Sequence, residues 1–235
     1  MGATKRILIV RHPEDPFERW GYVIHLLIEA WRERGLCVEL IYDIDRPVEA
    51  DVVIPHLDLT STPRAYRDFF ARYPVVLNRD ICDISKRRVS QNLVTRPDAF
   101  DGPVIVKTDR NAGGAPELDR LRRRGRVRRK LLQAARKLPW TLTGLVRTRD
   151  YKVYEHPRLV PRAVWHNPRL VVERFLPECQ GDLYVLRRYV FLGSREYNTM
   201  AFSPLPVVKA QNVVRRSKRC SPSHARPFAT GACCR

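Results

Sequence analysis

The first third of the chain alternates between short apolar runs and one apolar stripe at helical spacing. Residues 5–11 (KRILIVR) form an apolar, β-branched run that is typical of a buried strand. Apolar side chains recur at helical spacing over residues 17–34, which predicts a helix there. Further runs predict strands at residues 37–42, 51–55 and 74–77 and a short helix at residues 63–72. This order predicts an α/β domain with a small, largely parallel sheet covered by helices.

The pattern after residue 78 mixes helices with strands that pair antiparallel, so the second half is expected to be α+β. It predicts helices at residues 84–93 and 117–138, and strands at residues 103–107, 169–175, 183–191, 196–202 and 207–214. Residues 217–235 lack apolar periodicity and are rich in Ser, Pro, Arg and Cys. We therefore expect an N-terminal domain over residues 1–78, a second domain over residues 79–216, and a disordered basic tail over residues 217–235.

The charge of the chain is strongly positive but unevenly placed. The sequence holds 44 Lys+Arg against 25 Asp+Glu, a formal net charge of +19. Residues 120–137 contain ten basic side chains and no acid, and residues 215–235 contain six more. The remaining residues are therefore nearly neutral. The last carboxylate of the sequence belongs to Glu196.

The basic segment over residues 120–137 has three interpretations that the sequence leaves open. It is a solvated helix face, an electropositive lid that attracts an anionic nucleotide, or a segment that binds nucleic acid through phosphates. Its core-facing stripe would consist of Leu121, Val127, Leu131, Leu132 and Leu138.

Several classes of protein are disfavoured by the sequence. It has no apolar run of about 18 residues, the length of a membrane-spanning helix. The apolar run near the start is too short for a signal peptide. The six cysteines form no CxxC pair, which favours a reducing cytoplasm. We expect a cytoplasmic protein with no membrane partner. The motifs GxxxxGK[ST], GxGxxG, HExxH and GxSxG are also absent from the sequence.

A series of features along the chain suits a bound nucleoside triphosphate. Lys86 begins a predicted helix, and Lys107 ends the apolar strand PVIVK. Lysines at fixed places hold phosphates, and the small-residue loop over residues 111–114 lets backbone N–H groups approach them. The strand VVERF can offer its edge to an adenine. Just beyond it, Glu178 or Asp182 can accept hydrogen bonds from ribose hydroxyls.

This order of features over residues 6–216 resembles the ATP-grasp superfamily. The resemblance implies a Rossmann-like pre-ATP-grasp domain followed by an incomplete ATP-grasp domain that binds ATP. It also implies ligase-like chemistry that activates an unknown small-molecule carboxylate as an acyl phosphate and joins it to an amine. The ATP-binding positions implied are Lys86, Lys107, Asn111, Gly113, Gly114, Glu173, Arg174, Phe175, Leu176, Glu178, Asp182, Arg188 and Lys209, with Arg187 as the alternative to Arg188.

The sequence departs from this superfamily in its acidic residues. Its members hold Mg²⁺ on an Asp and a Glu-x-Asn pair in their last strands, because Mg²⁺ prefers carboxylate oxygens. No such ligands follow Glu196. We therefore expect an ATP-binding protein whose ligase activity is impaired. A frameshift or early end after Arg216 is our hypothesis for the tail. The alternative functions are nucleic-acid binding through residues 120–137 and a partner-binding pseudoenzyme.

Overall fold

The computed structural model describes residues 5–15, 21–123, 125–192 and 195–217. The chain divides into two compact units. Unit 1 comprises Met1–Gln91 and Thr108–Leu145, and unit 2 comprises Asn92–Lys107 and Val146–Arg235. Each unit is thus assembled from two stretches of chain. The expected domains, by contrast, were continuous stretches that met at residue 78.

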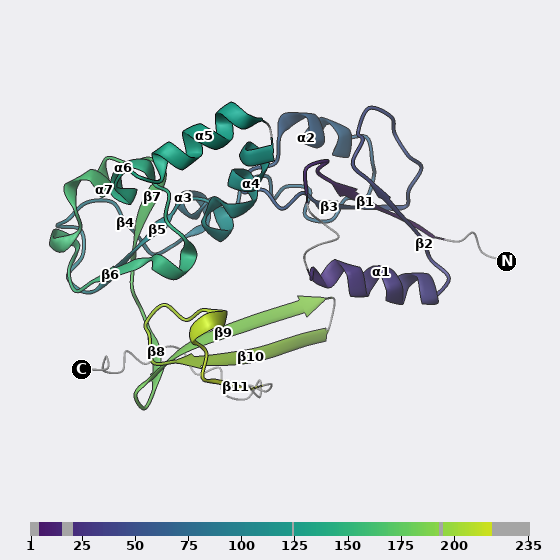
Figure 1. Cartoon of the computed structure of the whole chain (residues 1–235). Helices are drawn as coiled ribbons and strands as arrows, with labels where there is room; N and C mark the ends of the chain where they lie inside the picture. The colour runs from purple at the N-terminus through teal and green to yellow at the C-terminus, as the bar shows by residue number, and fades with distance from the viewer. Residues whose placement is uncertain (1–4, 16–20, 124, 193–194, 218–235) are drawn as a thin grey trace. The chain divides into compact units, whose positions relative to one another are not determined.

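Unit 1 contains a parallel sheet of three strands, β1 (Arg6–Arg11), β2 (Cys37–Ile41) and β3 (Val52–His56), in the order β2-β1-β3. Figure 1 shows α1 (Val23–Glu33) and α2 (Arg64–Phe70) on opposite faces of this sheet. The expected mixture of helices and parallel strands is therefore confirmed for this part of the chain.

The alternation of side chains along β1 explains the two faces. Leu8 and Val10 point to the side covered by α2, where Phe69 and Phe70 complete one buried cluster. Ile9 lies on the other side and packs with residues of α1, including Ile24 and Ile28. Because successive side chains of a strand point to opposite faces, one apolar strand supplies both cores.

The second stretch of unit 1 is held to the sheet by polar contacts from α4 (Ala115–Arg123). The Glu117 carboxylate accepts hydrogen bonds from the backbone N–H and the hydroxyl of Thr60, at 3.0 and 2.5 Å. The guanidinium of Arg120 donates to the carbonyl of Leu57. The loop after β3 and the start of α4 are thereby fixed together. The remaining helical elements of this stretch are η2 (Asn111–Gly114), α5 (Arg126–Ala135) and α6 (Trp140–Thr143), and α3 (Lys86–Val89) lies in the first stretch.

Unit 2 contains two sheets of four strands each. The first has the order β4-β7-β5-β6, formed by β4 (Leu93–Val94), β5 (Val104–Thr108), β6 (Lys152–Tyr154) and β7 (Leu170–Arg174). The second is an antiparallel sheet in the order β11-β10-β9-β8, formed by β8 (Glu178–Gln180), β9 (Leu183–Leu192), β10 (Arg195–Ser203) and β11 (Arg215–Ser217). The short helical elements are η3 (Thr148–Asp150), η4 (Pro157–Leu159), α7 (Arg162–Trp165) and η5 (Ala210–Asn212).

Several expected elements are wrong in extent or in kind. The helix expected over residues 84–93 spans only Lys86–Val89, and the strand expected over residues 74–77 is a single bridge between Val53 and Val76. The helix expected over residues 117–138 consists of α4 and α5, and Gly125, with a φ of 133°, interrupts it.

The strand expected over residues 207–214 is also wrong, because Asn212 turns the chain there. Its side-chain oxygen accepts from the N–H of Lys209, and its amide donates to the carbonyl of Val207. The result is the short helical turn η5, and the next strand begins at Arg215. The tail expected over residues 217–235 lies outside the described residues, except for Ser217 in β11.

Of the apolar stripe expected to face a core in the basic segment, Leu121 and Leu132 are half-buried, but the other three residues are exposed. Val127 is 72% exposed and Leu131 is 64% exposed, and Leu138 is also exposed. Conversely, Arg120 at the start of that segment is buried, with only 6% of its surface exposed. The segment therefore docks through a charged residue of α4, and no residue of α5 is fully buried.

Replacing Thr60 with Val tests how α4 is held to the sheet. The variant removes the hydroxyl that donates to Glu117 and accepts from the N–H of Asn111. We expect the free energy of unfolding to fall by about 1–3 kcal/mol, since both partners lose a partly buried hydrogen bond. Urea denaturation measures the change. The matched control is Thr62→Val, for which a loss below about 0.5 kcal/mol is expected. Equal losses in the two variants would contradict the role of Thr60.

Candidate functional site

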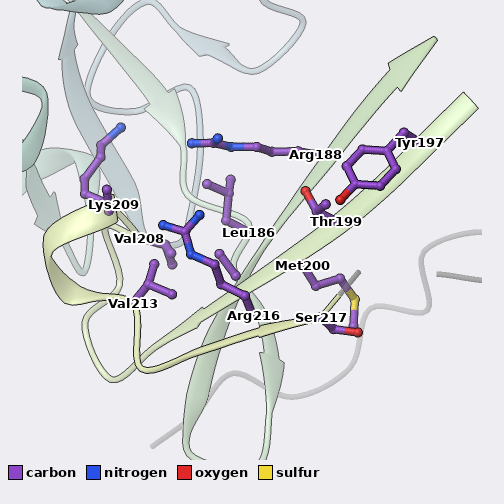
Figure 2. Close-up of a pocket in the computed structure, with 12 residues that line it drawn as sticks. Leu186, Arg188, Tyr197, Thr199, Met200, Val208, Lys209, Val213, Arg216 and Ser217 are labelled. Atoms are coloured by element: carbon purple, nitrogen blue, oxygen red, sulfur yellow. The ribbon is translucent and has the colours of Figure 1, made fainter. Parts of the chain in front are cut away.

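A pocket of about 180 Å³ lies over one face of the antiparallel sheet of unit 2. The register pairs Leu186 with Ala201 and Arg188 with Thr199, so these four side chains share that face. Arg216 of β11 is paired with Ala201 and lies on the same face. The loop between β10 and β11 covers the pocket with Val208, Lys209, Ala210 and Val213 (Figure 2).

The pocket is strongly cationic. Arg188, Lys209 and Arg216 line it, and no Asp or Glu is among the described residues that do so. Figure 2 shows the Arg188 guanidinium and the Lys209 ammonium approaching each other from the sheet and from the covering loop. Burial lowers the pKa of Lys209, and the positive charges of Lys107 and Arg188 lower it further. Such a cluster is costly by itself and favours an anion among its members.

Lys107 is held in place by a buried partner. Its ammonium lies 2.6 Å from the carboxylate of Glu173, which is on β7 and only 5% exposed. The sequence left open whether Glu173 points outward from its strand, and the structure places it inside. Because Lys107 is about one third exposed, its charge is anchored on one side and accessible on the other.

The segment after Glu173 was expected to hold an adenine through its backbone. The N–H of Arg174 donates to the carbonyl of Asn92, and that of Phe175 donates to the carbonyl of Pro103. The Arg174 guanidinium lies over the ring of Phe100, 5.2 Å from its centre. Leu176 follows directly and is 65% exposed. Of these residues, Leu176 is therefore best placed to offer its backbone to a ligand.

Glu178 and Asp182 differ in what they contact. Glu178 forms a two-fold ion pair with Arg187, with one oxygen 2.6 Å from the Arg187 Nε. Arg187 thus faces away from the pocket that Arg188 lines, as expected for neighbours on a strand. Asp182 is exposed in the turn between β8 and β9.

The other expected ATP-binding residues belong to unit 1. The ammonium of Lys86 donates to the carbonyl of Arg110 at 2.5 Å. The N–H of Asn111 donates to the hydroxyl of Thr60. Gly113 and Gly114 both have positive φ, and a Cβ on Gly114 would meet the Arg110 side chain at 3.0 Å. The expected residues are thus divided between the units, and Lys107, Glu173, Arg188 and Lys209 are the ones that gather within unit 2.

Sequence reasoning missed Arg216 as a lining residue. The sequence treats it as the end of the family-like region, and only the register of β11 against β10 brings it to the face that holds Arg188. In the described part of the chain, no group of three or more His, Cys, Asp or Glu side chains could hold a metal ion. Nor does any described helix have the length and apolar character needed to cross a membrane.

Comparison with known proteins gives no assignment: no family model matches the chain, and no curated protein matches it.

Replacing Lys107 with Met tests the ion pair. The variant leaves the Glu173 carboxylate buried without its countercharge, so we expect the free energy of unfolding to fall by about 2–3 kcal/mol. Adding Glu173→Gln to this variant removes the uncompensated charge and should recover at least about 1 kcal/mol. Urea denaturation of the two single variants and the double variant gives the coupling energy. Strictly additive losses would show that the two side chains do not stabilise each other.

Proposed function

We propose that unit 2 binds the phosphate groups of a nucleoside triphosphate, ATP, at the cationic pocket. The observation that carries this proposal is that Arg188, Lys209 and Arg216, from two strands and a loop, line one small volume. The charge of Lys107 also lies close enough to lower the pKa of Lys209. Three like charges repel one another, and a polyanion relieves that repulsion by forming charge-assisted hydrogen bonds with each.

The size of the pocket supports a phosphate chain rather than a whole nucleotide. Its volume of about 180 Å³ is below the roughly 300–1,000 Å³ of pockets that enclose complete small molecules. The base and ribose would therefore lie outside it. Leu176 offers a backbone group to the base, and Asp182 offers a carboxylate to the ribose, since Glu178 is engaged by Arg187.

The resemblance to the ATP-grasp superfamily supports ATP as the nucleotide and an ATP-dependent carboxylate–amine ligase as the class of protein. In that class, ATP supplies the phosphoryl group that activates a carboxylate. The residues lining this pocket do not fit Mg²⁺, because a divalent cation among Arg188, Lys209 and Arg216 would be repelled.

The test is ATP binding to the full-length chain, measured by isothermal titration calorimetry. We expect Lys209→Met to weaken binding about 10- to 100-fold, which corresponds to the loss of one charged hydrogen bond. We also expect it to raise the Tm without ATP by about 2 °C. The lowered pKa of Lys209 means that its charge costs stability at every pH below that pKa.

The matched control is Arg187→Met, the neighbouring cation on the same strand that pairs with Glu178 instead of lining the pocket. Its affinity for ATP should stay within about 3-fold of the wild type. Absence of ATP binding, or equal effects of Lys209→Met and Arg187→Met, would overturn the proposal.

A second candidate function is nucleic-acid binding through α5. Its cations Arg126, Arg128, Arg129 and Lys130 are all exposed, and the helix contains no acid. Phosphates contact such a surface without reading the bases.

Replacing Arg128, Arg129 and Lys130 together with Ser tests this second function. In a filter-binding assay with single-stranded RNA at several salt concentrations, the slope of log affinity against log salt should fall by about 2, because each lost phosphate contact removes about 0.7. The control replaces three exposed cations of unit 2, Lys152, Arg158 and Arg162, with Ser. RNA binding that is unaffected by the α5 variant would exclude this function.

A further inference from the structure

A second cluster of charged residues lies in unit 1, at the carboxyl ends of β1 and β3. These strands are parallel neighbours in the order β2-β1-β3. The chain leaves β1 toward β2 on one side, whereas β3 lies on the other, so the strand order reverses there. In open α/β sheets, ligands bind outside the carboxyl ends of strands at such a reversal.

The loops after the two strands bring four polar side chains together. The Asp15 side chain is only 1% exposed, and one of its oxygens lies 3.9 Å from the Nδ1 of His56. The Tyr22 hydroxyl donates to Asp58 at 2.7 Å, and its ring meets the His56 ring edge-on with centres 4.7 Å apart. Burial raises the pKa of Asp15 and lowers that of His56, so at neutral pH the His56 imidazole gives Asp15 little compensation.

The helix α4 adds two charged residues to this cluster. Arg120 is 6% exposed, and its guanidinium donates to the carbonyl of Leu57. Glu117 accepts from Thr60 through one oxygen. The negative charges of Asp15, Asp58, Glu117 and Glu14 all act on Arg120. Arg11 is the other arginine that acts on Asp15. Four carboxylates thus face two guanidinium groups, which leaves an excess of negative charge.

Several buried polar atoms of the cluster have no hydrogen-bond partner among the described residues. They include the Asp15 oxygen that lies 3.9 Å from His56, the second carboxylate oxygen of Glu117 and the Nη1 of Arg120. Buried polar atoms in proteins nearly always find partners, because leaving one unsatisfied costs stability. Two acceptors and one donor, in a surplus of negative charge, therefore point to a ligand of matching polarity.

We propose that this cluster is a binding site for a small primary amine that carries an oxygen acceptor next to its ammonium group, such as a free amino acid. The ammonium donates to the free oxygens of Asp15 and Glu117 and neutralises the excess charge. The adjacent oxygen of the ligand accepts from Nη1 of Arg120. This site belongs to unit 1 and requires neither the pocket of unit 2 nor a nucleotide.

The first test is a thermal shift of the full-length chain with each of the twenty proteinogenic amino acids, without nucleotide. We expect at least one of them, at about ten times its Kd, to raise the Tm by about 3–5 °C. The C-terminal amide of the same amino acid keeps the ammonium and an oxygen acceptor and should also bind. The N-acetyl derivative lacks the ammonium and should produce no shift. No shift with any amino acid, or an equal shift with the N-acetyl derivative, would overturn the proposal.

The second test measures the affinity of the amino acid that binds, by calorimetry, in two neutral variants. Asp15→Asn and Glu117→Gln keep the shape of each side chain and remove its charge, and each should weaken binding at least about 10-fold. Asp15→Asn should not lower the Tm, since the charge that it removes is costly where it is buried.

The matched control is Asp119→Asn. Asp119 lies on the same helix as Glu117, has a side chain that is 39% exposed, and pairs with Arg123. The affinity of the Asp119→Asn variant for the amino acid should equal that of the wild type. If Asp15→Asn and Glu117→Gln bind as tightly as Asp119→Asn, the amine does not occupy this cluster and the proposal fails. The outcome is independent of ATP binding, so failure here leaves the function proposed for unit 2 untouched.

Discussion

The arrangement of unit 2 depends on the ion pair between Lys107 and Glu173. It joins the end of β5 to β7 at a sheet with a largely apolar buried face, so it fixes the position of a positive charge beside the core. A carboxylate this deeply buried is tolerated only with a countercharge. The same pair therefore stabilises the sheet and holds one cation in a fixed position. The positive charge of Lys107 lowers the pKa of Lys209.

Much of the fold could be predicted from the sequence wherever the spacing of apolar residues determines the secondary structure. The strand β1 is apolar on both faces and the stripe of α1 has helical spacing, so their identities follow from hydrophobic pattern alone. The hydrophobic pattern does not predict the secondary structure correctly where polar contacts or a glycine determine the backbone conformation. Asn212 turns an apolar, strand-like run into a helical turn, and Gly125 divides a run that reads as one helix. Neither effect changes the spacing of apolar residues.

The candidate site likewise contains some residues that the sequence predicted and others that it did not. Lys107 was predicted because it ends an apolar strand, and Arg188 and Lys209 because of their positions in the order of features that resembles the ATP-grasp superfamily. All three lie within unit 2. Arg216 was missed because its place depends on strand register. Arg120 was missed because it begins a run of basic residues that suggests a solvated surface, whereas it is buried against the loop after β3. Burial of one charge within such a run leaves no signal in composition.

The discontinuous composition of unit 1 has a consequence for how the protein is made. The hydrogen-bond partners of Thr60 and Leu57 are Glu117 and Arg120. The ribosome synthesises these two partners only after the strands β4 and β5 of unit 2. The first unit therefore cannot reach its final structure on the ribosome before part of the second has emerged. This chain therefore cannot complete one unit before the other in strict order from the N-terminus. For the same reason, a single proteolytic cut cannot release either unit whole.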